Sequence, residues 1–206
     1  MKLFSIAALA LITATPAFAG APFLVDFEKN WDYGVDVNTY YSGGTAADGT
    51  SGSNLGVSFV NMSGLSNDSA FSYYANAPTM LGTAYAYTYA ETDKAYMNVA
   101  DGVDNALSFF YASPNAVSGA VVVYSGLNGT GTVLGSFDLA ANSSFAYDTW
   151  TQKTLTFNGS AKSFDFTASA NGVSLDNIAA VPEPETFAML LAGLGLLGFK
   201  ARRRNR

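Results

Sequence analysis

The sequence predicts an all-β protein: a single β-sandwich body flanked by an N-terminal signal-peptide helix and a short C-terminal hydrophobic helix. Three observations predict this. Short segments rich in aromatic and β-branched residues recur between clusters of Gly, Asn, Asp and Ser. No stretch of the body keeps an apolar period of 3.6 residues over three turns, so helices should be few and short. Apolar runs stand at both ends, and 206 residues suffice for one domain with a sizeable core.

The N-terminus has the pattern of a secretory signal peptide. Met1-Lys2 precedes the apolar run 3–12, and Pro16-Ala17-Phe18-Ala19 follows. Small residues at positions 17 and 19 form an A-x-A cleavage site, so we expect signal peptidase to remove residues 1–19. An uncleaved anchor or a buried core helix is the alternative, but the run is short for spanning a bilayer.

The body, residues 20–181, is expected to contain eleven strands. They are 23–27, 57–60, 71–74, 85–89, 95–99, 107–111, 120–124, 133–139, 153–157, 163–168 and 173–178. Asn128-Gly129 predicts a hairpin turn, because both residues tolerate positive φ, and Asn158-Gly159 predicts a second. The Gly- and Ser-rich stretch 38–54 is expected to be a long surface loop, serving either ligand binding or simple connection.

Composition excludes most hydrolase chemistry. The chain has neither Cys nor His, so it has no disulfide, no thiolate nucleophile, no imidazole base and no zinc site of the His/Cys kind. The body has four lysines and no arginine against fourteen Asp and Glu residues, a formal charge of −10, so nucleic acid is not an expected partner. An enzyme here would be a two-carboxylate glycosidase, yet no motif fixes such a pair. We therefore predict no catalytic residues and no enzymatic activity.

A divalent cation suits the body better, since Asp, Asn and Gly are abundant and softer ligands are absent. In strand alternation Asp26 and Glu28 share one face, opposite Phe27. The first and last strands of one domain often lie close together, which would bring Asp176 near them.

The opening Asp26-Phe27-Glu28, the strand around 102–111 and the closing Leu175-Asp176-Asn177-Ile178 resemble galactose-binding-like, carbohydrate-binding jelly-roll domains. This resemblance implies a jelly-roll arrangement and a structural calcium held by Glu28 and Asp176, with Asp26 a weaker candidate. The alternative is that these acids are exposed or hydrogen-bonded.

A row of tyrosines is the other feature of the body that suggests a ligand-binding role. Tyr85, Tyr87 and Tyr89 would point to one face of a strand, opposite small residues. They could form a stacking platform for sugar rings, or the buried face of the sandwich with hydroxyls at its rim.

The C-terminus combines three signals. Pro182-Glu183-Pro184 precedes the apolar stretch 187–199, and the basic end 200–206 follows. Its cationic residues, which should stop membrane transfer and stay in the cytoplasm, are Lys200, Arg202, Arg203, Arg204 and Arg206. A helix over 187–199 would be about 20 Å long, short of a hydrocarbon core of about 30 Å, so it is a minimal membrane segment.

Residues 182–206 resemble the PEP-CTERM sorting signal in the order and spacing of these parts. The resemblance implies transient insertion in the inner membrane, processing by an exosortase, and delivery to the cell surface or extracellular matrix of a Gram-negative bacterium. A plain membrane anchor is the alternative.

These observations predict an exported, non-enzymatic component of a biofilm or exopolysaccharide matrix that binds carbohydrate. Two alternatives remain: a carboxylate-dependent glycosidase or lyase acting on exopolysaccharide, and a purely structural surface protein.

Overall fold

The computed structural model describes residues 22–180, and this part of the chain is all-β, as predicted. The strands are β1 Leu24–Val25, β2 Tyr33–Asp36, β3 Val57–Val60, β4 Met62–Leu65, β5 Thr83–Ala86, β6 Tyr96–Ala112, β7 Val117–Tyr124, β8 Val133–Leu139, β9 Thr151–Asp165 and β10 Ser174–Ala180. One-turn 3₁₀ helices occur at η1 Tyr40–Ser42, η2 Leu127–Gly129 and η3 Thr167–Ser169. Within 22–180 no helix is long and apolar enough to cross a membrane. The predicted signal peptide and sorting tail lie outside the described residues.

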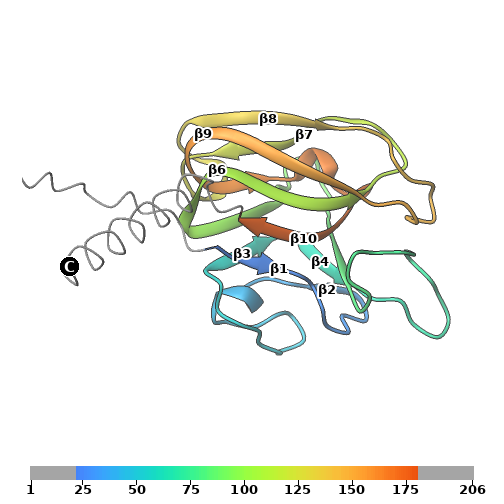
Figure 1. Cartoon of the computed structure of the whole chain (residues 1–206). Helices are drawn as coiled ribbons and strands as arrows, with labels where there is room; N and C mark the ends of the chain where they lie inside the picture. Colours follow the sequence, from blue (N-terminus) through green and yellow to red (C-terminus); the bar gives the residue numbers. More distant parts are fainter. Residues whose placement is uncertain (1–21, 181–206) are drawn as a thin grey trace, which may run out of the picture.

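The strands form one antiparallel hydrogen-bonded sheet in the order β2-β4-β5-β10-β6-β9-β7-β8, with β1 added to β10 and β3 to β6. Figure 1 shows this sheet folded into two layers, with β7, β8 and β9 above and β1–β4 and β10 below. The body is therefore a single β-domain closed over one core, as the sequence predicted.

The core lies between the layers and is rich in aromatic rings. Trp31, Phe27 and Phe164 are fully buried. Phe109 meets Phe166 edge-on, with ring centroids 5.9 Å apart. Burying each such side chain is worth about 1.5–3 kcal/mol, so this cluster supplies much of the driving force for folding.

The second predicted hairpin is wrong. Segments 153–157 and 163–168 belong largely to one long strand, β9, and segments 95–99 and 107–111 belong to its partner β6. Asn158-Gly159 lies inside β9, where Gly159 has a φ of 96° and the pairing with β6 shifts register between Asp104 and Ala106. β6 and β9 pair on both sides of Asn158-Gly159, so these two residues form a β-bulge within β9 and the chain does not turn back there.

The first predicted hairpin is confirmed between β7 and β8. Asn128 and Gly129 have φ values of 53° and 70° within the connection. The Asn128 backbone N–H donates to Asn98 Oδ1, and Asn98 Nδ2 donates to Asn128 Oδ1, each at 2.8 Å. Segment 38–54 is a loop, as expected, with η1 inside it.

The predicted strand 71–74 is wrong, because side chains capture its backbone donors. Asp68 Oδ1 accepts from the N–H groups of Ala70 and Phe71, each at 2.7 Å. Asn67 Oδ1 accepts from the N–H of Tyr73 at 2.7 Å. These bonds replace a strand ladder, so the segment belongs to the long connection 66–82 between β4 and β5.

The two ends of the domain are neighbours, as predicted: Leu24 of β1 pairs with Ala179 of β10. However, β1 ends at Val25, and Phe27 adopts a φ of 53°. Asp26 and Glu28 therefore do not share the face of a strand, although Phe27 is buried as expected.

Candidate functional site

Strand register builds one outer face from β2, β4, β5 and β10. Tyr85 of β5 is opposite Ser63 of β4 and Ser174 of β10, and Asp36 of β2 is opposite Ser63. The alternate residues of β5 and β10, Ala84 and Leu175, are fully buried in the core. Side chains that the sequence keeps far apart thus gather on one outer surface.

The three predicted tyrosines lie on this surface, although the strand that begins them is shorter than expected. β5 ends at Ala86, whose carbonyl accepts from the N–H of Asn171 at 2.9 Å. Tyr85 and Tyr87 are half-buried, and Tyr89 is 92% exposed. The interpretation of the three rings as a buried face of the sandwich does not hold, since Ala84 and Ala86 fill the core side instead.

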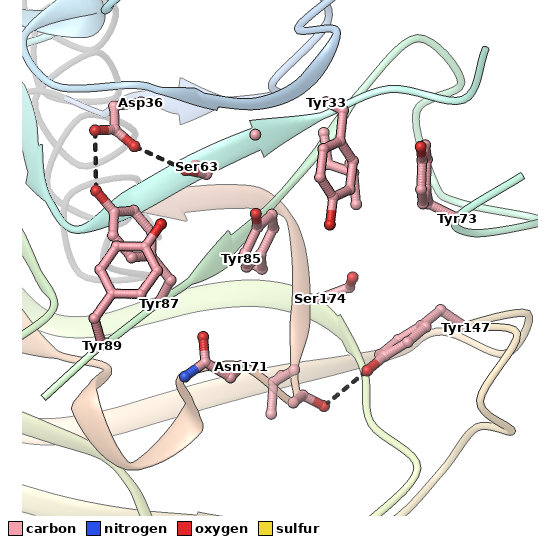
Figure 2. Close-up of a pocket in the computed structure, with 14 residues that line it drawn as sticks. Tyr33, Asp36, Ser63, Tyr73, Tyr85, Tyr87, Tyr89, Tyr147, Asn171 and Ser174 are labelled. Carbon is pink, nitrogen blue, oxygen red and sulfur yellow. Dashed lines mark hydrogen bonds between the residues drawn. The ribbon is translucent and has the colours of Figure 1, made fainter. Parts of the chain in front are cut away.

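The tyrosines line a surface pocket of about 700 Å³. Figure 2 shows rings approaching it from several segments of the chain. Its six tyrosines are Tyr33, Tyr73, Tyr85, Tyr87, Tyr89 and Tyr147. The remaining lining residues are Gly34, Asp36, Ser63, Leu65, Asn171, Gly172, Val173 and Ser174. This volume is within the range of small-molecule sites.

Two ring groups flank the pocket. The ring of Tyr33, which is 68% exposed, lies 5.1 Å from that of Tyr73 between centroids, and Phe71 stacks on Tyr73 at 6.0 Å. Tyr87 and Tyr89 are 5.2 Å apart. The pocket therefore presents ring faces together with phenolic edges, which suits a ligand with both apolar and hydroxyl surface.

The pocket contains one carboxylate, that of Asp36. Its oxygens accept hydrogen bonds from Ser63 Oγ at 2.8 Å and from the Tyr87 hydroxyl at 2.9 Å (Figure 2). Burial, followed by the contact with Asp36, raises the pKa of Tyr87, so the phenol keeps its proton and donates. Burial also raises the pKa of Tyr73, Tyr85 and Tyr147.

Sequence reasoning missed Tyr33, Tyr147 and Asp36 as partners of the predicted tyrosines. Tyr147 comes from the connection between β8 and β9, where its hydroxyl donates to the Gly172 carbonyl at 3.4 Å. The sequence does show that these tyrosines lie in polar segments. It does not show the strand order that brings the segments together in the fold.

The structure brings the predicted calcium residues together around the connection 66–82. Asp176 is fully buried and accepts from the Thr79 N–H at 3.0 Å and from Thr79 Oγ1 at 2.8 Å. Glu28 accepts from the Leu81 N–H at 2.8 Å. The Asp26 carbonyl lies 3.0 Å from Thr79 Oγ1, while its carboxylate accepts from the Glu28 N–H at 3.2 Å. Both acids thus tie this connection to the domain.

Burial is the main cause that raises the pKa of Asp176 to about 6, and the charge of Glu28 adds to it. Hydrogen bonds from Thr79 and Asn177 oppose the rise. Within residues 22–180, two buried polar atoms have no hydrogen-bond partner: Asn177 Oδ1, next to Asp176 in the chain, and Thr83 Oγ1. Continuing the β5–β10 register one residue beyond Leu175 and Ala84 brings Thr83 opposite Asp176.

These oxygens fit the hard ligands that calcium prefers, and two carboxylates match its charge. Within 22–180, however, no group of three or more His, Cys, Asp or Glu residues that could hold a metal ion occurs. Backbone and amide oxygens would have to complete the ligand set. Calcium binding by Glu28 and Asp176 stays a prediction.

Comparison with known proteins identifies the end of the chain. Residues 180–204 match the PEP-CTERM protein-sorting motif. The chain carries a PEP-CTERM sorting signal. This signal implies that the protein is exported, is processed by an exosortase and resides at the surface or outside the cell. No curated protein matches the chain.

Solved structures resemble the body at low identity. A carbohydrate-binding module of Cellvibrio mixtus lichenase 5A, in complex with cellotriose, is 18% identical with a TM-score of 0.35, over 53% of this chain and 84% of that one. CBM35 from Paenibacillus barcinonensis is 17% identical with a TM-score of 0.36, over 62% and 94%. Arthrobacter globiformis T6 isomalto-dextranase, complexed with panose, is 10% identical with a TM-score of 0.40, over 78% of this chain and 32% of that one. These values assign no ligand to this chain.

Proposed function

We propose that the protein is a non-enzymatic surface or matrix component that binds glycan chains in the tyrosine pocket and is thereby retained on exopolysaccharide, as in a biofilm. The observation that carries this proposal is the convergence of six tyrosines on one open pocket. Sugar rings present C–H faces that pack on aromatic rings, while their hydroxyls need polar partners. Asp36, Ser63, Asn171 and Ser174 offer such partners in the same pocket.

A binding role fits the pocket better than glycoside hydrolysis. Glycosidases use two carboxyl groups about 5–9.5 Å apart across the scissile bond. Asp36 is the one carboxylate among the residues that line this pocket. Tyr87, the phenol bonded to it, holds its proton firmly because its pKa is raised, which makes it a poor general base.

The pocket is well placed for a protein sorted through its C-terminus. Ser174 lines the pocket at one end of β10, and the sorting motif begins at residue 180 at the other end. Six residues of strand separate these points by about 20 Å. The pocket therefore lies about 20 Å along β10 from the residue at which the matched sorting motif begins.

Replacing an exposed ring should remove binding without unfolding the protein. Tyr33→Ala and Tyr89→Ala alter side chains that are 68% and 92% exposed, so the free energy of unfolding should change by less than about 0.5 kcal/mol. Loss of one stacking ring should weaken retention of the exported protein on the host exopolysaccharide about two- to tenfold, measured by affinity electrophoresis.

Phe145→Ala is the matched control, because Phe145 is 80% exposed and does not line the pocket. Equal retention of the Tyr33, Tyr89 and Phe145 variants and the unaltered protein would show that the pocket is not the binding site.

We also propose that calcium stabilises the domain at Glu28 and Asp176. What supports this proposal is that both carboxylates bind the same connection, Asp176 at Thr79 and Glu28 at Leu81, and that carboxylate and backbone oxygens are the ligands calcium prefers. Calcium should raise the melting temperature relative to EDTA, and Glu28→Gln and Asp176→Asn should abolish the rise. Asp101→Asn, an exposed acid of β6, should leave it unchanged. A calcium response that survives both site variants would place the ion elsewhere.

A further inference from the structure

The tyrosine pocket is negatively charged, because its lining includes the carboxylate of Asp36. Among the described residues, its titratable lining consists of Asp36 and six tyrosines, with no lysine or arginine. The phenols are neutral at neutral pH, so the carboxylate of Asp36 is the only formal charge that residues 22–180 contribute to the lining.

Asp36 has no cationic partner within the described residues: the one ion pair there joins Lys29 and Asp48. Both of its hydrogen bonds come from neutral hydroxyls, those of Ser63 and Tyr87. A carboxylate has about four acceptor positions, so two remain for a ligand. Asp36 is also only half-buried, which leaves it within reach from the pocket.

The surrounding rings favour the same kind of ligand. Tyr87 donates to Asp36, and its neighbour Tyr89 lies 5.2 Å away between ring centroids. Ring faces attract a cation placed over them, and a carboxylate beside aromatic rings is the arrangement that binds ammonium groups. The rest of the body adds to this field, because its formal charge is −10.

We propose that the pocket selects glycans that carry protonated amino sugars, with Asp36 as the residue that determines this specificity. The inference rests on the proposed glycan binding and narrows it to one chemical class. The ammonium group of a de-N-acetylated hexosamine sits beside Asp36 while the sugar rings pack on the tyrosines. Polymers rich in uronic acid or sulfate bind poorly, because their charge has the sign of the pocket.

Three β-1,4-linked tetramers test this selectivity with the exported protein: glucosamine, N-acetylglucosamine and glucose. They differ only at C2, which carries an ammonium, an acetamide or a hydroxyl group. By titration calorimetry at pH 6 and low salt, the glucosamine tetramer should bind about fivefold more tightly than the glucose tetramer. The preference should shrink at 0.5 M salt, where charges are screened.

Asp36→Asn should bring the ratio of glucosamine-tetramer to glucose-tetramer affinity close to one. Asp101→Asn, which removes one exposed charge outside this pocket, should preserve the ratio. If Asp36→Asn fails to fold, the pH profile of the unaltered protein decides. An amine of this kind loses its proton near pH 8, so the preference should disappear at pH 9. Tyr85 and Tyr87, which face Asp36, keep their protons there because their pKa values are raised.

Equal binding of all three tetramers would overturn the amine preference and leave glycan binding standing. If no tetramer binds while retention on the host polymer still depends on Tyr33, the amine preference is wrong and the pocket is a glycan site of another specificity. If no tetramer binds and retention on the host polymer does not depend on Tyr33, both the amine preference and glycan binding in this pocket are wrong.

Discussion

The outer face of β5 and the outer face of β9 differ sharply, although both strands cover the same core. On β9, Leu155 and Phe157 point inward and are buried, while Thr154 and Thr156 between them are exposed. On β5, Ala84 and Ala86 point inward and Tyr85 faces out, half-buried at the wall of the pocket. The large side chains are thus on the inner face of β9 and on the outer face of β5.

This inversion has a packing consequence. Gly64 of β4 pairs with Ala84 of β5, and a Cβ added at Gly64 would meet the Trp31 indole at 2.2 Å, so small residues at this position leave room for the buried Trp31 ring. The aromatic area on the outer face contributes little to that core. We conclude that the large side chains of β9 stabilise the core, whereas those around β5 lie on the outer face, where a ligand can contact them.

Core truncation should produce the largest effect and should be similar in the two regions. Leu155 of β9 and Leu175 of β10 are both fully buried. Leu155→Ala and Leu175→Ala should each lower the free energy of unfolding by about 2–5 kcal/mol in urea titrations, through lost burial and the cavity left behind.

Thr154→Ala serves as the outer-face control and should change stability by less than about 0.5 kcal/mol. A Leu175→Ala loss below about 1 kcal/mol would show that the pocket side of the sheet does not share the core of the β9 side.

The sequence predicts the inner faces well and the outer site only in part. Alternation in 133–139 and around 153–157 identifies strands because each inward residue must be apolar. The same reasoning locates Tyr85, Tyr87 and Tyr89 but cannot find Tyr33 or Asp36, because their meeting depends on the order β2-β4-β5-β10. Nothing local in the chain specifies which strand pairs with which.

The errors have local physical causes. The expected face shared by Asp26 and Glu28 is lost because Phe27 turns to positive φ, which allows its ring to enter the core. Asn158-Gly159 is compatible with a turn or a bulge, and the long partner strand β6 decides for the bulge. In both cases tertiary packing overrides a correct local preference.

A second prediction sharpens the comparison within the outer face itself. Ser174 and Asp176 lie on the same face of β10, yet Ser174 lines the pocket while Thr79 covers Asp176. Burial raises the pKa of Asp176 to about 6, above its ordinary value near 4. Between these pH values the folded protein binds more protons than the unfolded chain, so stability should fall as pH rises from about 4 to about 6 and stay lower above it.

In EDTA this fall should reach about 2–3 kcal/mol, measured by urea unfolding at pH 4, 5, 6 and 7. Asp176→Asn should remove this contribution, because the amide does not titrate, while Asp138→Asn, whose carboxylate lies exposed on β8, should leave it in place. Calcium at the same site would favour the ionised carboxylate and should therefore stabilise the protein more at pH 7 than at pH 4. If the free energy of unfolding of Asp176→Asn still falls between pH 4 and pH 6, another group causes the pH dependence. The covered position of Asp176 and the open position of Ser174 on β10 would then not differ in this respect.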